Sequence, residues 1–94
     1  MAGMIVKRSG QWLSAPVGDD LVMMSADTGN YVTVSRIGRR IWELIEPPRS
    51  LEDLCAQLVR EFEVEPEVCA AQMDRFLNEM AAYHAVELTP SPAG

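Results

Sequence analysis

The sequence has few of the side chains on which catalysis and metal binding depend. Its 94 residues include one histidine, His84, and two cysteines that form no C-x-x-C pair, and they contain no H-E-x-x-H pattern and no glycine-rich phosphate loop. Enzymes normally need a nucleophile with a base, a pair of carboxylates or a set of metal ligands. His84 lies near the end of the last expected helix, where positive charge is favourable without any catalytic role. We therefore expect a binding protein, with no metal site and no cofactor.

Long hydrophobic runs are absent as well. No uninterrupted apolar run exceeds four residues, as in Leu21–Met24, so no segment is long enough to span a membrane. Near the N-terminus the apolar residues precede Lys7 and Arg8, which reverses the order of a secretory signal. Cys55 and Cys69 both occupy apolar positions of helical patterns, as small buried thiols do. These observations predict a cytoplasmic protein.

A continuous basic stripe is also missing. The net charge is −6, the isoelectric point is about 4.6, and residues 43–94 hold eleven acidic residues against three arginines. Proteins that track phosphates gain affinity from such a stripe, so we do not expect nucleic acid as the main partner. The one basic cluster, Arg36, Arg39 and Arg40, is either a solvated surface or a patch that meets an acidic peptide or an enzyme partner.

Size and composition predict one folded domain. With 48% hydrophobic and 23% charged residues, the chain is similar in composition to folded globular proteins. Its length suffices for a single modest core and not for a deep enclosed active site. We expect one domain over residues 1–94, with an ordered core at about 10–88.

Three segments in the first half of the chain predict strands. A period of two with β-branched and aromatic residues runs through Gln11–Val17, Asp20–Ala26 and Asn30–Val34. Residues 18–20 supply one turn, and in the next turn Gly29 takes the position that needs a positive φ. The pattern therefore predicts two hairpins in a three-stranded antiparallel sheet.

Such a sheet cannot close into a barrel, so at least one edge keeps unpaired N–H and C=O groups. Asn30–Val34 contains neither proline nor charge, the usual protections against pairing with another chain, and we expect its edge to be open. The alternative is that a terminal segment, Met4–Arg8 or Val86–Thr89, covers this edge. An open edge also permits a swapped dimer, although a monomer is preferred.

Helical periodicity follows the third strand without a break. Ser35 is expected to cap a helix that carries Ile37–Ile45 and stops at Pro47-Pro48. A second helix begins with a capping box at Ser50, and Pro66 begins a third. The complete pattern predicts an α+β fold in which a three-stranded sheet is followed by three helices.

The third helix has an apolar face with a shoulder on either side. The face centres on residues at helical spacing that include Cys69, Met73 and Phe76. Gln72 belongs to one shoulder and Asp74 to the other, and a partner could reach either. Methionine-rich faces can repack around varied ligands, although methionines also fill irregular gaps in cores.

These segments resemble a known family. The resemblance is to PqqD-like proteins, the small peptide-recognition proteins of ribosomally made peptide natural products, also called RiPP recognition elements. It spans residues 10–88 and is carried by Asp27–Ser35, Gly38 with Ile41–Ile45, Ser50–Leu54 and the closing helix around Met73–Met80. The chain departs from the family pattern at three turns, where it has Val34-Ser35, Pro47-Pro48-Arg49 and His84-Ala85-Val86.

The resemblance implies a winged helix-turn-helix-like fold in which the leader peptide of a precursor adds as a strand beside the third strand and lies against the third helix. The main-chain ladder would then come from Asn30, Tyr31, Val32, Thr33 and Val34. The opposing wall would consist of Cys69, Gln72, Met73, Arg75 and Phe76. A proline at Val32 would weaken the ladder if the Val32 N–H faces outward.

As a stand-alone chain with these departures, the protein is most similar to the leader-binding subunit of lasso-peptide systems, which works with a separate leader peptidase. The implied function is a non-catalytic adaptor that delivers the precursor to that enzyme. The alternatives are a pyrroloquinoline quinone-type peptide chaperone for a radical SAM enzyme, a winged-helix regulator that binds DNA, and a small subunit that stabilises an enzyme without touching its substrate.

Overall fold

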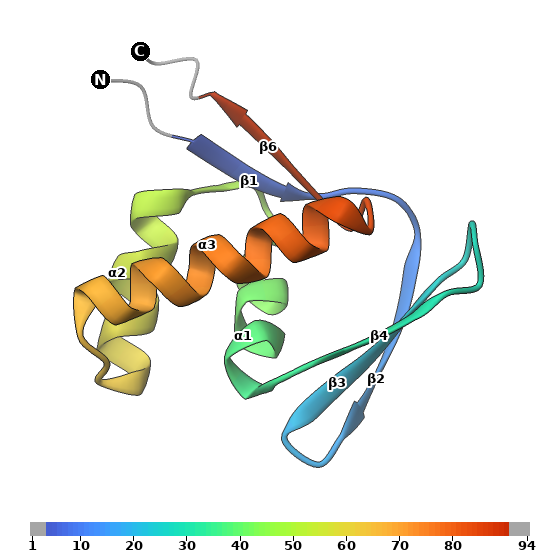
Figure 1. Ribbon diagram of the computed structural model, residues 1–94, viewed down its shortest axis with the longest axis horizontal. Coiled ribbons are helices and arrows are strands. Elements are labelled where there is room, and N and C mark those ends of the chain that lie inside the picture. The colour runs from blue at the N-terminus through green and yellow to red at the C-terminus, as the bar shows by residue number, and fades with distance from the viewer. Residues whose placement is uncertain (1–3, 91–94) are drawn as a thin grey trace.

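Figure 1 presents the fold as a computed structural model that describes residues 4–90. The elements are β1 (Met4–Arg8), β2 (Trp12–Val17), β3 (Asp20–Ser25), β4 (Tyr31–Val34), α1 (Arg36–Leu44), β5 (Arg49–Ser50), α2 (Leu51–Phe62), α3 (Pro66–Ala82) and β6 (Val86–Pro90). The three strands and three helices expected from the sequence are all present, so the predicted α+β fold is confirmed. None of the described helices is long and apolar enough to cross a membrane.

The strands form two antiparallel sheets of three strands each, in the orders β2-β3-β4 and β5-β1-β6. The first is the predicted double hairpin. The second brings the ends of the described chain together, since β1 pairs with β6 along its whole length and β5 adds to the other side of β1. The terminal segments therefore pair with each other, and the alternative in which one of them covers β4 is wrong for the described residues.

One apolar core lies between the two sheets and the three helices. Every layer contributes a side chain that is at most 1% exposed, and these include Val6, Met23, Ile41, Leu54 and Met73. In Figure 1, α3 runs across the middle of the molecule, with β1 and β6 above it and α1 below it. Because α3 contributes its whole buried face to this core, its remaining faces are held at fixed positions relative to the sheets.

The turn into β4 is fixed by local hydrogen bonds. The Oγ of Ser25, which is buried, accepts from the N–H groups of Asp27 at 3.2 Å and Thr28 at 3.1 Å. Gly29 has a φ of +77°, as the turn pattern predicts. This geometry sets where β4 begins and in which direction it runs.

The helix starts agree only partly with the predicted caps. The Oγ of Ser50 accepts from the N–H of Asp53 at 3.1 Å, so this predicted cap is confirmed. Ser35 occupies the N-cap position of α1, but its side chain makes no capping hydrogen bond. The end of α1 is capped from the second sheet: Arg8 donates to the Trp42 carbonyl at 3.0 Å, and Arg49 donates to the Leu44 carbonyl at 2.6 Å.

An ion pair joins α1 to α2. Arg40 donates from Nε to Glu61 Oε1 at 2.7 Å and from Nη2 to Glu61 Oε2 at 2.9 Å. This bidentate contact lowers the pKa of Glu61 to about 2, with a smaller contribution from Gln57. Both side chains are partly exposed, at 37% for Arg40 and 26% for Glu61, so solvent screens part of the attraction.

Replacing Glu61 with glutamine should lower the free energy of unfolding by about 1 kcal/mol near neutral pH, because the charged partner of Arg40 is lost. The pKa of Glu61 is lower in the folded chain than its ordinary value of 4.5. Its contribution is therefore complete above about pH 4.5 and declines as the pH falls toward 2. Urea unfolding of both proteins, followed by circular dichroism at several pH values, measures the difference. An equal difference at about pH 7 and pH 3 would contradict this assignment.

Candidate functional site

The outer edge of β4 is unpaired within the described chain. The strand order β2-β3-β4 places β4 at the end of its sheet, with β3 as its partner. No other strand among residues 4–90 lies along its outer side. The open edge predicted from the absence of proline and charge is therefore present in the structure.

The register indicates which backbone groups point outward. The Ser25 N–H donates to the Asn30 carbonyl at 2.9 Å, and in an antiparallel ladder the paired and unpaired positions alternate. Val32, opposite Met23, therefore directs its N–H and C=O toward β3, whereas Tyr31 and Thr33 direct theirs to the open edge. The Val32 N–H does not face outward, so a proline at Val32 would not remove a group from the open edge. Thr33 is the position at which proline would remove an outward N–H.

The opposite edge of this sheet is protected. In β2 the Gln11 carbonyl accepts from the Ala26 N–H at 2.8 Å, so by the same alternation the nitrogen of Pro16, opposite Leu21, points away from β3. Proline has no N–H to offer a foreign strand at that position. The sheet thus has one edge that hinders strand addition and one that permits it.

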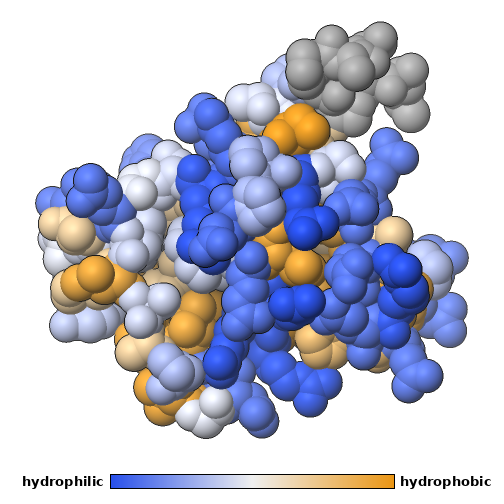
Figure 2. All heavy atoms as spheres, turned by 180° about the vertical axis from the view of Figure 1, so that it is seen from behind, coloured by the Kyte–Doolittle hydropathy of each residue, from blue (hydrophilic) through white to orange (hydrophobic). Residues whose placement is uncertain are grey.

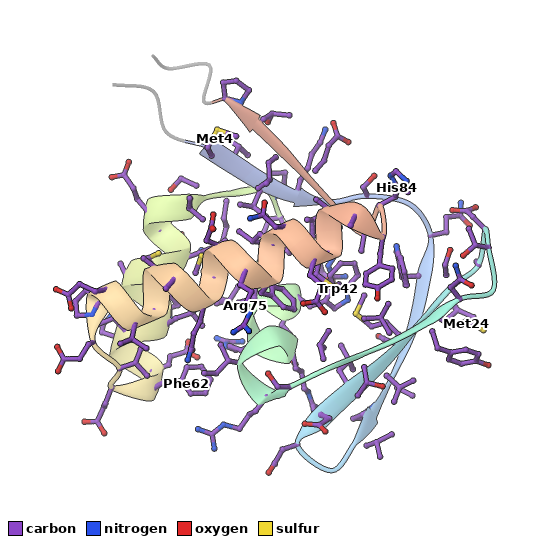
Figure 3. The ribbon with its side chains drawn as sticks, in the orientation of Figure 1. Met4, Met24, Trp42, Phe62, Arg75 and His84 are labelled. Atoms are coloured by element: carbon purple, nitrogen blue, oxygen red, sulfur yellow. The ribbon has the colours of Figure 1, made fainter. Side chains whose placement is uncertain are left out.

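A groove with a volume of about 390 Å³ runs between β4 and α3. Its sides come from the end of β4 and from one shoulder of α3, and α1 forms its floor. The lining residues are Thr33, Val34, Ser35, Ile37, Gly38, Ile41, Gln72, Arg75, Phe76, Glu79 and Met80. Figure 3 shows Arg75 projecting from α3 on the side of α1. The floor is apolar, and the rim on α3 carries an amide, a positive charge and a negative charge.

Gly38 allows α3 to approach α1 closely beneath this groove. A Cβ atom on Gly38 would lie 2.7 Å from Phe76 Cε1 and 3.1 Å from Val34 Cβ. Both distances are shorter than ordinary van der Waals contact. The Phe76 ring therefore occupies space that a larger residue at position 38 would take from it, and both residues line the groove.

The structure brings together part of the site predicted from the sequence. Thr33 and Val34 line the groove opposite Gln72, Arg75 and Phe76. The remaining ladder residues lie outside the groove lining: Asn30 precedes β4, and Tyr31 and Val32 are its first two residues. Cys69 and Met73 are 4% and 1% exposed and belong to the core beneath α3, so their side chains support the wall from behind.

Several lining residues were missed by sequence reasoning. Ile37 and Ile41 were expected only as apolar residues of a helix, and Glu79 was not among the residues expected to form the wall. The signal was nevertheless available, because Gln72, Phe76 and Glu79 recur at the spacing of one helix face. The structure identifies this shoulder as the one beside β4.

The predicted partner patch on α1 is largely neutralised by carboxylates. Arg39 lies 3.5 Å from Glu43, and Arg40 contacts both Glu43 and Glu61. The Arg36 guanidinium lies 5.0 Å from the centre of the Phe62 ring. This patch lies outside the groove lining.

His84 lies beyond the groove, after the last residue of α3. Its N–H donates to the Ala81 carbonyl at 3.0 Å and its φ is +62°, which is the left-handed conformation that often ends a helix. The predicted position at a helix C-terminus is therefore confirmed. Within residues 4–90, no three His, Cys, Asp or Glu residues are grouped so that they could hold a metal ion.

Comparison with known proteins identifies one family and a solved structure with a similar fold. No curated protein matches the chain. Among solved structures, the chain is similar to TbiB1 in complex with the TbiA(beta) leader peptide, with 27% sequence identity and a TM-score of 0.76 over 86% of this chain and 94% of that chain.

The family model of coenzyme PQQ synthesis protein D (PqqD) matches residues 20–86. This span runs from the first residue of β3 to the first residue of β6 and contains both sides of the groove. It covers well over half of the chain. The chain therefore belongs to the PqqD family.

Proposed function

We propose that this chain is a non-catalytic adaptor that binds the leader region of a ribosomally synthesised precursor peptide and delivers the precursor to a processing enzyme. The observation that carries the proposal is the open edge of β4 beside a groove of about 390 Å³. Strand addition at such an edge is a common mode of peptide recognition. The similarity to TbiB1, whose structure contains a leader peptide, supports the same use of this site.

Affinity and selectivity come from different parts of the site. Tyr31 and Thr33 direct N–H and C=O groups to the edge, and each hydrogen bond to a peptide backbone contributes about 0.5–1.5 kcal/mol whatever the side chain. Every second side chain of an added strand would point into the groove, since side chains alternate across a strand. The apolar floor of Ile37 and Ile41, together with Phe76 of the wall, favours apolar side chains there.

The proposed partner is the leader peptidase of a lasso-peptide pathway. The similarity to TbiB1, whose structure contains a leader peptide, supports this choice of pathway. A second candidate is a peptide chaperone for a radical SAM enzyme, which the PQQ synthesis description of the family model favours. The genes beside that of this chain distinguish the two, because a leader peptidase or a radical SAM enzyme would be encoded there.

DNA binding is a weaker candidate function than either of these two peptide-binding functions. The α1 arginines that would contact phosphates are paired with Glu43 and Glu61, and the helical half of the chain is acidic. We further propose a cytoplasmic location, with Cys55 and Cys69 as free thiols. A monomer is the proposed state of the free chain.

A titration with a labelled synthetic leader peptide, taken from the precursor encoded beside this chain, tests the proposal. Saturable binding is expected. Replacing Thr33 with proline should weaken it by at least about fivefold, because proline removes an outward N–H. The sheet itself loses no hydrogen bond, since the Thr33 N–H does not point toward β3. Thr33→Ala, which keeps the N–H, is the matched control. Circular dichroism verifies that each variant folds. No leader binding by the folded wild-type chain would contradict the proposed function, and equal binding by Thr33→Pro and Thr33→Ala would contradict the β4 geometry.

Replacing Gly38 with alanine should reduce leader affinity by about tenfold, because the added methyl group displaces the Phe76 ring into the groove. The same titration measures this loss. Combining the change with Phe76→Leu, which frees space beside position 38, should recover most of the lost affinity. A Gly38→Ala chain that folds and binds the leader as tightly as wild type would show that the groove does not depend on the close contact between Gly38 and Phe76.

A further inference from the structure

A second cavity lies at the C-terminal end of α3, apart from the groove. We call it the end pocket; it has a volume of about 230 Å³, and its lining includes Gly10, Trp12, Asp27, Thr28, Tyr83 and His84. Figure 3 shows His84 at the end of α3 on the side of the turn between β3 and β4. In the view from behind in Figure 2, hydrophilic residues gather at the left end of the molecule, where this turn lies.

Two hydrogen-bond acceptors lie close together beside Gly10. A Cβ atom on Gly10 would lie 3.3 Å from the His84 carbonyl oxygen and 3.6 Å from Asp27 Oδ2, and the nearest donor is Trp12 Nε1 at 3.3 Å. Gly10 has a φ of +73°, so a residue without a side chain suits this position and leaves the space open. The pocket thus offers a carboxylate and a carbonyl to a group that can donate several hydrogen bonds.

The charge of Asp27 is not balanced by the residues around it. Its Oδ2 accepts one long hydrogen bond from the Gln11 N–H, at 3.4 Å. The salt bridges found among residues 4–90 do not include Asp27, and none of the described residues that line the end pocket is a lysine or an arginine. A ligand that brings a positive charge would therefore pair with this carboxylate.

Aromatic side chains complete the lining. Trp12 is partly buried, whereas Tyr83 is 45% exposed. Aromatic rings attract cations, and the planar guanidinium of arginine both stacks on rings and donates to carboxylates. A lining that is aromatic and acidic favours a lysine or arginine side chain over an acidic or a wholly apolar one.

The end pocket continues the proposed leader site along α3. Glu79 lines the groove, and Tyr83 follows it by four residues, one turn further along the same face. On the side of the sheet, Thr28 precedes Tyr31, the first residue of β4, by three positions. A peptide that pairs with β4 and extends past Tyr31 would reach the end pocket within about four residues, since an extended chain advances about 3.3 Å per residue.

We infer that the end pocket is a second subsite for the leader peptide, and that it binds the side chain of a lysine or arginine that flanks the segment paired with β4. The inference rests on the proposed function. Asp27 supplies the opposite charge, the His84 carbonyl accepts a further hydrogen bond, and the rings contact the apolar stem of the side chain. The site thereby distinguishes leaders that carry a basic residue at this flank from leaders that do not.

The test is a titration of the full chain with the synthetic leader peptide of the precursor encoded beside it. Asp27→Asn should lower leader affinity by about fivefold at low salt, because it removes the charge and keeps an oxygen that can accept from the Gln11 N–H. The difference from wild type should shrink at about 500 mM salt, which screens exposed charges. Asp19→Asn is the matched control, since it removes one exposed acid from the other turn of the same sheet, and it should change affinity by less than about twofold.

Leader variants identify the side chain that binds. Each lysine and arginine of the leader is replaced with glutamine in turn. One such change, within about four residues of the segment paired with β4, should weaken binding to the wild-type chain by about fivefold and should weaken binding to Asp27→Asn much less, as for two partners in contact. Circular dichroism verifies that both protein variants fold.

The outcomes separate the two claims. A folded wild-type chain that does not bind leader would contradict the proposed function and, with it, this inference. Leader binding that Asp27→Asn leaves unchanged would overturn only the end pocket as a subsite. Equal losses for Asp27→Asn and Asp19→Asn would trace the effect to net charge and would overturn it too. A loss at Asp27→Asn that is coupled to no basic leader residue would overturn the assignment of the bound side chain.

Discussion

A three-stranded sheet has two edges, and the backbone N–H and C=O groups on each edge must find partners. The two edges of the β2-β3-β4 sheet differ in the backbone groups that they present. Pro16 points its nitrogen outward from β2, where it hinders pairing, whereas Thr33 presents an N–H from β4. An incoming strand therefore has one available position, and it is the edge that borders the groove.

The second sheet keeps that edge available. β1 and β6 pair with each other on the far side of α3, so the described terminal strands are used there and do not reach β4. Arg8 and Arg49 then fix the end of α1 to this second sheet through its last carbonyl groups. The α1 floor and the α3 wall are thereby held in fixed positions beside β4. A site that is pre-organised in this way loses less conformational entropy when a peptide binds.

Much of the fold could be predicted from the sequence, because the strand and helix signals are local. The period-two pattern of residue types predicted the three hairpin strands, and Ser50 and Pro66 correctly predicted where two helices begin. The pairing of β1 with β6 depends on contacts between the two ends of the chain, which no local pattern reports. For the site, helical spacing identified Gln72 and Phe76, but the burial of Cys69 and Met73 and the place of Gly38 under the groove depend on how α1 packs against α3.

The central claim, that outward groups of β4 stay unpaired until a peptide docks there, is tested most directly by amide hydrogen exchange measured residue by residue with NMR. In the free chain, the amides of Val32 and Val34 should be protected through β3, and those of Tyr31 and Thr33 should exchange rapidly. Added leader peptide should slow exchange at Tyr31 and Thr33 alone within β4. Slow exchange at both positions in the free chain, or no change on addition of a peptide that binds, would contradict the account.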